Sequence, residues 1–428
     1  MARSQRPTSR PWFAAVVILM AAMPAFAQNP AQYATQKVPQ SATPGAAQTP
    51  GATQDAPWMM SAQATPGGLK AATAGDYQTK LAAYTLARRS FDVQLTAYWN
   101  AISDKRRVRI AKRRNNDPIG LDDYVLTQPP IYKGPPRPTD PAAPSASDPT
   151  EAHRPEIPVV ADFLKAAADQ FGFVPQRPKT DFDFKLAYAK AATAVGLTRD
   201  QVVRIYAFET GGNGTYDVQA GLTHPRPGAR AISPAVGYNQ LLSTNSVSLM
   251  AEHGDGFLRS LRQIASGLPG EAKVAMEQKI EAVKRMIAFS RSVPNAWSEH
   301  DILAKNTPGG RGIHAAILDR DLGPLMQSQK LLNSVRFAKS KGYRASLTGA
   351  ELEMMNFTGD GNGLDMVMMP PELRELVPTS NFFQQSGYER NPIARRTGVV
   401  SVLFDSIEKK MDQASQLRGA KELAEAFY

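Results

Sequence analysis

The sequence predicts a mostly α protein in which a long basic helix and a proline-rich segment precede a larger helical domain. Apolar residues recur at spacings of three and four over much of the chain after residue 158, which is the period of an amphipathic helix. Strand-like alternation is rare, and the dense prolines of residues 117–158 separate two helical regions.

Residues 1–27 have the pattern of a secretory signal peptide. Arg3, Arg6 and Arg10 precede the apolar stretch PWFAAVVILMAAMP, which is short for a membrane span, and AFA stands immediately before Gln28. We therefore expect a cleavable signal peptide and a periplasmic mature protein. An uncleaved membrane anchor is the alternative that this pattern leaves open.

Residues 28–69 are predicted to be a disordered linker. They consist largely of Ala, Gln, Thr, Pro and Gly, with few large apolar side chains. Such a composition buries too little apolar surface to offset the entropy lost on ordering.

An amphipathic basic helix is predicted over residues 70–116. Its apolar face comprises Tyr77, Leu81, Tyr84, Phe91, Leu95, Tyr98 and Ile102. Arg88 interrupts the heptad, so packing on the same chain is favoured, although a self-associating coiled coil stays open. The basic run 104–114 suits a helix C-terminus. It is either a solvated charged end or a segment attracted to an anionic envelope surface.

Residues 117–158 are too rich in proline for a helix and favour extended, polyproline-like chain. The stretch YVLTQPPIYKGPP also contains enough Tyr, Val and Ile to dock along a surface. We expect this segment to be part strap and part linker, and to mark a domain boundary.

Residues 159–428 are predicted to form one helical domain. The helical patterns cover Val159–Phe171, Phe184–Val195, Arg199–Glu209, 271–290, 323–342 and Val399–Gln416.

The composition excludes several classes of function. The net charge of +11 favours anionic partners, and export argues against nucleic acid. No glycine-rich phosphate loop is present, so no cofactor is expected. The chain has no cysteine and its five histidines show no ligand spacing, so no metal site is predicted. Asp360 and Asp365 lack the spacing of a calcium loop, which favours a turn there.

One acid, Glu209, ends an apolar helix in the stretch IYAFETGGNGTYD. Thr198 and Gln201 predict a capping box at the start of this helix, and the glycines after Glu209 predict its end. The negative end of the helix dipole and the neighbours Tyr206 and Phe208 disfavour a charged carboxylate. We expect Glu209 to stay protonated near neutral pH, as general-acid cleavage of a glycosidic bond requires.

Three short segments follow in order: FETGG around Glu209, GYNQL at 237–241 and MMNF at 354–357. Together they resemble the Glu-Ser, Gly-x-x-Gln and Asn motifs of the soluble lytic transglycosylase, or lysozyme-like, family of peptidoglycan-cleaving enzymes. The resemblance covers roughly residues 156–400. It implies a lysozyme-like helical fold and cleavage of the β-1,4 bond between N-acetylmuramic acid and N-acetylglucosamine, which leaves 1,6-anhydro ends.

The same resemblance assigns roles to residues of this chain. Glu209 matches the catalytic acid/base, and peptidoglycan glycan strands are the implied partner. The residues implied to bind the sugar are Thr210, which replaces the serine of the first motif, Gly237, Tyr238, Gln240 and Asn356.

The chain departs from the family pattern in two places. Met355 replaces the tyrosine that usually precedes the asparagine, and a long stretch, 241–355, separates Gln240 from Asn356. These departures favour an alternative function, a non-catalytic peptidoglycan-binding or envelope scaffold that keeps the groove. If the enzyme hydrolyses instead, Asp217 is the best second acid, although a loop Asp is more often a turn former.

Four aromatic side chains are candidates to stack on sugar rings, although aromatic residues are usually core. They are Trp297, Phe382, Phe383 and Tyr388.

Overall fold

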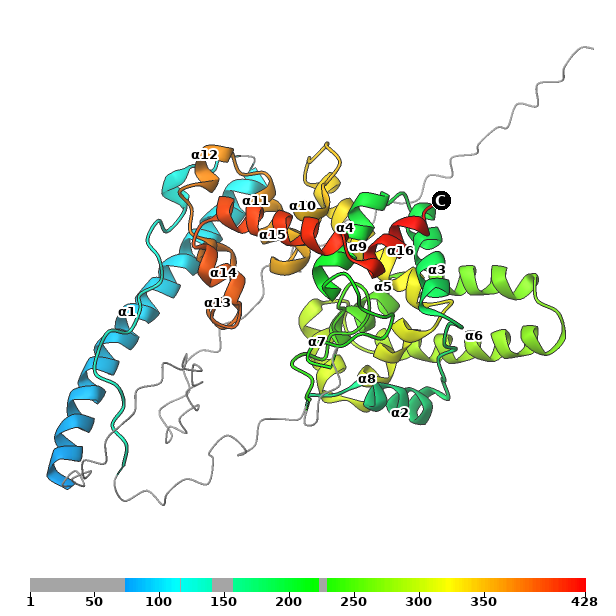
Figure 1. Ribbon diagram of the computed structural model, residues 1–428, viewed down its shortest axis with the longest axis horizontal. Helices are drawn as coiled ribbons and strands as arrows, with labels where there is room; N and C mark the ends of the chain where they lie inside the picture. Colours follow the sequence, from blue (N-terminus) through cyan, green and yellow to red (C-terminus); the bar gives the residue numbers. More distant parts are fainter. Residues whose placement is uncertain (1–73, 116, 141–156, 223–228) are drawn as a thin grey trace, which may run out of the picture. The chain divides into compact units, whose positions relative to one another are not determined.

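The computed structural model describes residues 74–115, 117–140, 157–222 and 229–428, all within one structural unit, Gln54–Tyr428 (Figure 1). Within these ranges the regular elements are helices, and extended chain pairs only as isolated bridges such as Val236 with Leu241. The predicted mostly α class is confirmed. The predicted signal peptide and the linker 28–69 lie outside the described residues.

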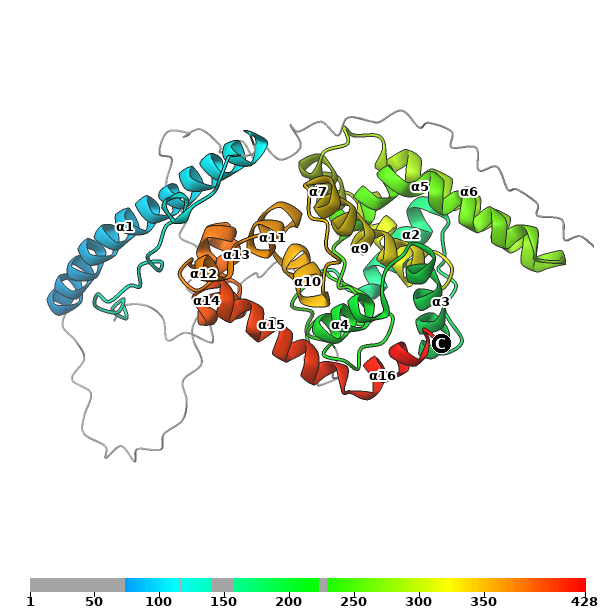
Figure 2. The ribbon, with the colours of Figure 1, turned by 90° about the horizontal axis from the view of Figure 1, so that it is seen from above.

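Helix α1 spans Ala74–Asn115, and the larger helical region follows residue 157 (Figures 1 and 2). Its helices are α2 Val160–Phe171, α3 Asp181–Ala194, α4 Arg199–Thr210, α5 Ser243–Ser266, α6 Gly270–Ser290, α7 Trp297–Asn306, α8 Pro308–His314, α9 Gly323–Ser340, α10 Gly349–Thr358, α11 Asp360–Val367, α12 Pro371–Arg374, α13 Gln385–Glu389, α14 Pro392–Thr397, α15 Val400–Ser415 and α16 Arg418–Glu425. Short 3-10 turns are η2 Leu121–Asp123, η4 Ala315–Leu318 and η5 Thr379–Phe382. None of the helices in the described ranges is long and apolar enough to cross a bilayer.

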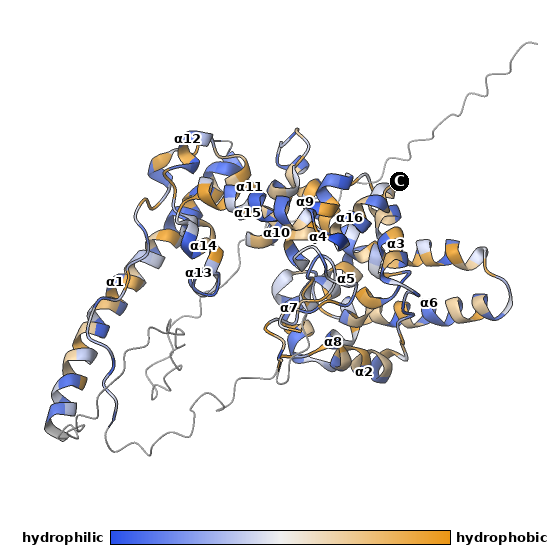
Figure 3. Cartoon of the chain, in the orientation of Figure 1, coloured by the Kyte–Doolittle hydropathy of each residue, from blue (hydrophilic) through white to orange (hydrophobic). Residues whose placement is uncertain are grey.

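Two apolar clusters hold these helices together. One is built mainly from α3, α4, α9, α10, α15 and α16, and it takes in Trp99 and Ile102 of α1. The other is built mainly from α2, α5, α6 and α8. The helices that form these two clusters carry both hydrophobic and hydrophilic residues along their length (Figure 3). Helix α4, which carries Glu209, belongs to the first cluster.

The segment that follows α1 runs back along it. The ring of Tyr132 meets the rings of Tyr84 and Phe91 of α1 edge-on, at centroid distances of 6.2 and 5.4 Å. Tyr98 donates its hydroxyl to the carbonyl of Thr127 at 3.0 Å. Residues 117–140 therefore dock on α1, and residues 141–156 of the predicted strap lie outside the described residues.

The basic end of α1 is largely engaged inside the protein. Arg109 is completely buried and donates to the carbonyls of Asp123 at 2.8 Å and Asn381 at 3.0 Å. Arg106 donates to the carbonyl of Phe383 at 2.7 Å, and Arg113 forms an ion pair with Asp365 of α11. These three cations attach α1 to the C-terminal part of the chain, whereas Arg107 and Arg114 of the same run are exposed.

Helix α5 was not predicted, because its sequence, STNSVSLMAEHGDGFLRS, is rich in serine and glycine. The structure gives the reason for one of these glycines. A Cβ atom on Gly254 would lie 2.4 Å from Cγ1 of Ile287, so glycine lets α6 approach α5 closely (Figure 2). Tertiary packing outweighs the weak helix propensity here.

Candidate active site

Helix α4 presents Glu209 in its last turn, as its end signals predict. The hydroxyl of Thr198 accepts from the Gln201 N–H at 3.2 Å, and the Gln201 side chain accepts from the Thr198 N–H at 2.9 Å. The helix ends at Gly211, with φ of 65°, and Gly212 follows with φ of 79°. A Cβ on Gly212 would lie 2.2 Å from the Ala414 carbonyl oxygen, so this glycine also permits the close approach of α15.

Asn356 of α10 contacts Glu209 directly. Its side-chain Nδ2 donates a hydrogen bond to Oε1 of Glu209 at 2.8 Å, although the two residues are 147 positions apart. Both views show α10 beside α4, and the two helices pack against each other (Figures 1 and 2). The packing of α4 on α10 thus brings the acid of the first motif to the asparagine of the third.

A second carboxyl group, that of Glu353, lies at the same place. Glu353 stands one turn before Asn356 on α10 and is completely buried, and neither of its carboxyl oxygens has a hydrogen-bond partner among the described residues. Glu209 and Glu353 lie close enough to influence each other's pKa, and two neighbouring carboxyl groups can share a hydrogen bond only if one of them carries a proton. Glu353 is not among the site residues predicted from the sequence. The available signal was a glutamate inside the otherwise apolar run LEMM, three residues before Asn356.

Burial dominates the electrostatics of this carboxyl pair. It raises the pKa of Glu209 to about 7, against the opposing effects of Glu353, Lys410, Asn356 and Lys330. Burial, and then the charge of Glu209, also raise the pKa of Glu353 well above its usual range. The two groups titrate as a pair. A protonated carboxylic acid near neutral pH is the state that the sequence analysis expected for Glu209.

Two cations approach Glu209 from other helices. Lys410 of α15 is exposed, and its Nζ lies 3.9 Å from the centroid of the Phe208 ring. Lys330 of α9 is partly buried and contacts the hydroxyl of Ser334 at 3.5 Å. Both favour the ionised form of Glu209, so they keep its pKa from rising further.

Tyr238 of the second motif is part of the core. It is completely buried, and its hydroxyl donates to Oδ1 of Asp181 at 2.9 Å. Its ring meets the ring of Tyr206 edge-on at 4.8 Å, one turn before Glu209 on α4. The structure therefore places Tyr238 beneath α4 as a packing residue, where its side chain is not available to a sugar.

Gln240 and Gly237 shape a tight turn. Gly237 has φ of 85° and Gln240 has φ of 43°, a left-handed conformation that costs a non-glycine residue roughly 1 kcal/mol or more. The Gln240 amide offsets part of this cost, because its Nε2 donates to the carbonyls of Gly237 at 2.9 Å and Val218 at 3.1 Å. The amide donors of Gln240 are thus directed into its own turn.

The remaining candidates of the first motif have local partners. Thr210 donates its hydroxyl to the Tyr206 carbonyl at 2.7 Å, within its own helix. Asp217, the predicted alternative second acid, accepts from the Thr215 hydroxyl at 2.7 Å, as a turn residue does. The carboxyl group found close to Glu209 is that of Glu353 instead.

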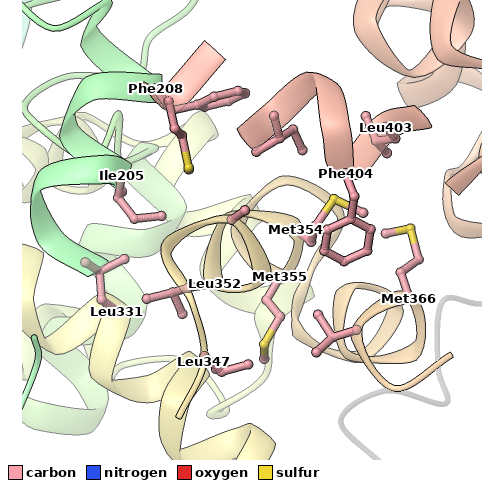
Figure 4. Close-up of a cluster of buried hydrophobic side chains, with 14 of the residues drawn as sticks. Ile205, Phe208, Leu331, Leu347, Leu352, Met354, Met355, Met366, Leu403 and Phe404 are labelled. Atoms are coloured by element: carbon pink, nitrogen blue, oxygen red, sulfur yellow. The ribbon is translucent and has the colours of Figure 1, made fainter. Parts of the chain in front are cut away.

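Met355 occupies an apolar site. It is completely buried among the side chains shown in Figure 4, close to Leu352 and Leu347. A Cβ on Gly363 would lie 2.3 Å from the Cα of Met355, so α11 packs tightly against α10 at this position. A tyrosine here would have to bury its hydroxyl in an apolar cluster, which explains why methionine suits this chain.

The other predicted positions have structural roles. Asp360 accepts from Ser334 at 2.7 Å, and burial raises the pKa of Asp365 to about 6 although it pairs with Arg113. Within the described ranges, no group of three potential metal-ligating side chains is present. Of the four aromatic candidates, Trp297 is half exposed, whereas the buried ones are Phe382, Phe383 and Tyr388.

Comparisons with protein-family models, with curated proteins and with solved structures find no match for this chain. The functional interpretation therefore rests on the three motifs and on the geometry around Glu209.

Proposed function

We propose that this protein is a peptidoglycan lytic transglycosylase in which Glu209 is the catalytic acid and base. The observation that carries the proposal is the 2.8 Å hydrogen bond between Asn356 and Glu209, which joins two of the three motifs at one carboxyl group. Burial supplies the second requirement, because it raises the pKa of Glu209 into the range of a general acid.

The first chemical step breaks the β-1,4 glycosidic bond. Protonated Glu209 donates its proton to the oxygen that leaves with N-acetylglucosamine. The acetamido oxygen of N-acetylmuramic acid attacks C1 from the opposite side, so that the sugar itself supplies the nucleophile. Glu209 is left as a carboxylate, and the N–H donor of Asn356 stabilises that charge.

The second step forms the 1,6-anhydro ring. The 6-hydroxyl of the same sugar attacks C1, the bond from the acetamido oxygen breaks, and Glu209 takes up the hydroxyl proton. No water enters, and Glu209 returns to its protonated state. One carboxyl group therefore suffices in principle, whereas a hydrolase requires a second carboxylate as nucleophile or as base for a water molecule.

The placement of the other acids supports the lytic reaction over hydrolysis. Glu353 is completely buried, so its carboxyl cannot touch the sugar. Asp217 is bonded within its own turn. Hydrolysis would need one of these groups at the anomeric carbon or at a water beside it.

The test compares Glu209→Gln with Asp217→Asn in the full chain, using purified cell-wall sacculi as substrate. Glu209→Gln is expected to lose at least roughly 100-fold in glycan cleavage, because general acid–base catalysis contributes about that much or more. Asp217→Asn is expected to stay within about threefold of wild type. Circular dichroism and thermal unfolding must show that both variants fold. Retained activity in Glu209→Gln would overturn the proposal.

A non-catalytic envelope scaffold is the second candidate. It is favoured by the second motif, in which Tyr238 is buried and the amide donors of Gln240 are used within the turn. Fewer groups then remain to hold a sugar. Wall binding by the wild type with no release of fragments, at any pH between 5 and 8, would establish this alternative.

Periplasmic export is part of the proposal, because peptidoglycan lies outside the cytoplasm. It rests on residues 1–27, which lie outside the described residues. Cell fractionation, with the mature N-terminus identified by mass spectrometry, checks it. The expected mature chain begins at Gln28, and a chain that still starts at Met1 would contradict export by cleavage.

A further inference from the structure

Glu353 has a different environment from an ordinary buried carboxylate of this protein. Asp319 is also completely buried, and it accepts from Lys279 Nζ at 3.0 Å and from the main-chain N–H of Gln176 at 2.8 Å. Two further main-chain N–H groups, of Asp321 and Leu322, complete its shell. That set of donors is what an ionised carboxylate needs when it leaves water.

Glu353 has no such shell. Neither of its oxygens has a hydrogen-bonded N–H or O–H donor in the part of the chain that the structure describes. The amide of Asn356, one turn on, is directed to Oε1 of Glu209. The group that faces Glu353 is the Glu209 carboxyl. A charge at Glu353 would therefore be buried beside a second acid, and the favourable effects of Asn356 and Lys410 do not outweigh that burial. A neutral carboxylic acid at this position has a proton to donate to the neighbouring carboxylate.

We propose that Glu353 is a positioning residue, held as a neutral carboxylic acid that donates a hydrogen bond to the Glu209 carboxylate. Its significance for catalysis rests on the proposed function. Asn356 and Glu353 then form a pair of donors from one face of α10, and both point at the acid of α4.

In the proposed reaction, the Glu353 O–H acts between the two chemical steps. Glu209 loses its proton to the leaving oxygen in the first step and regains one from the 6-hydroxyl in the second. Between these steps the Glu353 O–H stabilises the Glu209 carboxylate and fixes its orientation. Glu353 is completely buried, so its carboxyl contacts neither substrate nor solvent and keeps its own proton throughout.

The charged groups around the pair come from three helices. Glu209 of α4 faces Glu353, and Lys410 of α15 acts on both carboxyls. Lys330 of α9 acts on Glu209. Both lysines are kept in every variant below, so that changes in titration report the carboxyl pair alone.

The experiment is a titration of the glutamate side chains in the full chain, with ¹³C-labelled glutamate carboxyls followed by NMR. Glu353→Met fills the space without a donor, and Glu353→Gln retains an N–H donor. In Glu353→Met the pKa of Glu209 is expected to rise by roughly one unit or more, because a hydrogen bond to its charged form is lost. In Glu353→Gln it should stay within about half a unit of wild type.

Two further variants serve as a control and as an independent test of the coupling. Glu252→Gln changes an exposed glutamate of α5 whose side chain accepts a hydrogen bond from the hydroxyl of Ser248, and it should leave the Glu209 titration unmoved. In Glu209→Gln the neighbouring charge is removed, so the Glu353 titration should move downward. This last measurement remains decisive even if Glu353→Met fails to fold.

Three results would overturn the inference. A fall in the Glu209 pKa of Glu353→Met would mean that Glu353 is ionised and acts as a charge. An unmoved Glu209 would mean that Glu353 only fills space, and an unmoved Glu353 in Glu209→Gln would remove the coupling between them.

Because this titration needs no substrate, its failure is distinct from a failure of the proposed function. If the pair titrates as expected and sacculi stay intact, the proposed function falls and the donor role stands. If the wild type cleaves glycan and Glu209 does not respond to Glu353→Met, the donor role falls alone. When both hold, the basic limb of the pH–rate profile moves to higher pH in Glu353→Met.

Discussion

The carboxyl pair Glu209–Glu353 makes stability depend on pH at the scale of single residues. Burial raises the pKa of Glu209 from 4.5 to about 7, so the folded state holds this proton more tightly than the unfolded chain. The resulting stabilisation is present in full below pH 4.5 and is lost as the pH rises through 7. Above that pH, Glu209 is ionised in the folded protein, and burying its charge lowers the free energy of unfolding.

Replacing the acid should therefore stabilise the protein most at high pH. Glu209→Gln is expected to raise the unfolding free energy by roughly 1–3 kcal/mol at pH 8 relative to its effect at pH 5. Urea unfolding at both pH values measures this difference. Glu372→Gln, on the exposed side of α12, is the control and should show the same small effect at each pH. An equal loss of stability at both pH values in Glu209→Gln would contradict the raised pKa.

Asn356 offers a second residue-scale prediction, about rate. Asn356→Ala removes the N–H donor to Glu209, and a hydrogen bond to a charged group is worth roughly 1.5–3 kcal/mol. Glycan cleavage should fall about 10-fold to 100-fold. Asn362→Ala on α11 is the matched control, because that amide donates to the Thr358 carbonyl of the preceding helix at 3.3 Å, and its activity should stay within about twofold. Equal activities of the two variants would remove Asn356 from the site.

At the scale of elements, α1 is attached to the protein by buried cations. Arg109→Ala leaves the Asp123 carbonyl without its guanidinium donor and leaves the Asn381 carbonyl with the 3.2 Å hydrogen bond from Arg106. It also removes a cation 4.5 Å from the centroid of the Tyr124 ring. The expected loss in unfolding free energy is roughly 2–4 kcal/mol. Urea unfolding measures the loss, and faster amide hydrogen exchange along α1 locates it.

Arg107→Ala is the control for this prediction. Arg107 lies two residues away in the same basic run, is 73% exposed and pairs with Asp104 of its own helix. Its removal should change stability by less than about 0.5 kcal/mol. Similar losses for Arg107→Ala and Arg109→Ala would show that the charge of the run matters and that its buried contacts do not.

Features of helices that depend on neighbouring residues in the sequence could be predicted. The cap of α4 at Thr198, its end at Gly211 and the resulting position of Glu209 all follow from neighbours in the sequence. Helix α5 was missed, because its glycine is explained only by contact with α6. Glu353 was missed for a related reason: a glutamate in an apolar helix becomes informative only when the helix that faces it is known.

The predicted site residues differ in the same way, because only some of their side chains are directed at Glu209. Asn356 meets Glu209, whereas Tyr238 packs in the core and Thr210 bonds to its own helix. A motif identifies which residues occur together, but the direction of each side chain depends on packing. The long stretch 241–355, which separates the second motif from the third, contains helices α5 to α9 and supplies much of the second apolar cluster.

At the scale of the whole molecule, the site depends on the assembly of distant parts of the chain. Glu209 comes from α4, Glu353 and Asn356 from α10, and Lys410 from α15, and these helices pack on one another. Helix α1 joins the same apolar cluster through Trp99 and Ile102. We therefore expect the active protein to be the full chain, and experiments on function should use it.

The identity of the released product tests the central claim most directly. Full-length wild-type protein is incubated with sacculi at about pH 6, below the raised pKa of Glu209, and the soluble fragments are identified by mass spectrometry. A lytic transglycosylase must release muropeptides that end in 1,6-anhydro-N-acetylmuramic acid, each lighter by one water than the hydrolysis product. Muropeptides with ordinary reducing ends would contradict the claim, since hydrolysis requires a second carboxylate that reaches the substrate or a water, whereas Glu353 is completely buried and Asp217 is bonded within its own turn.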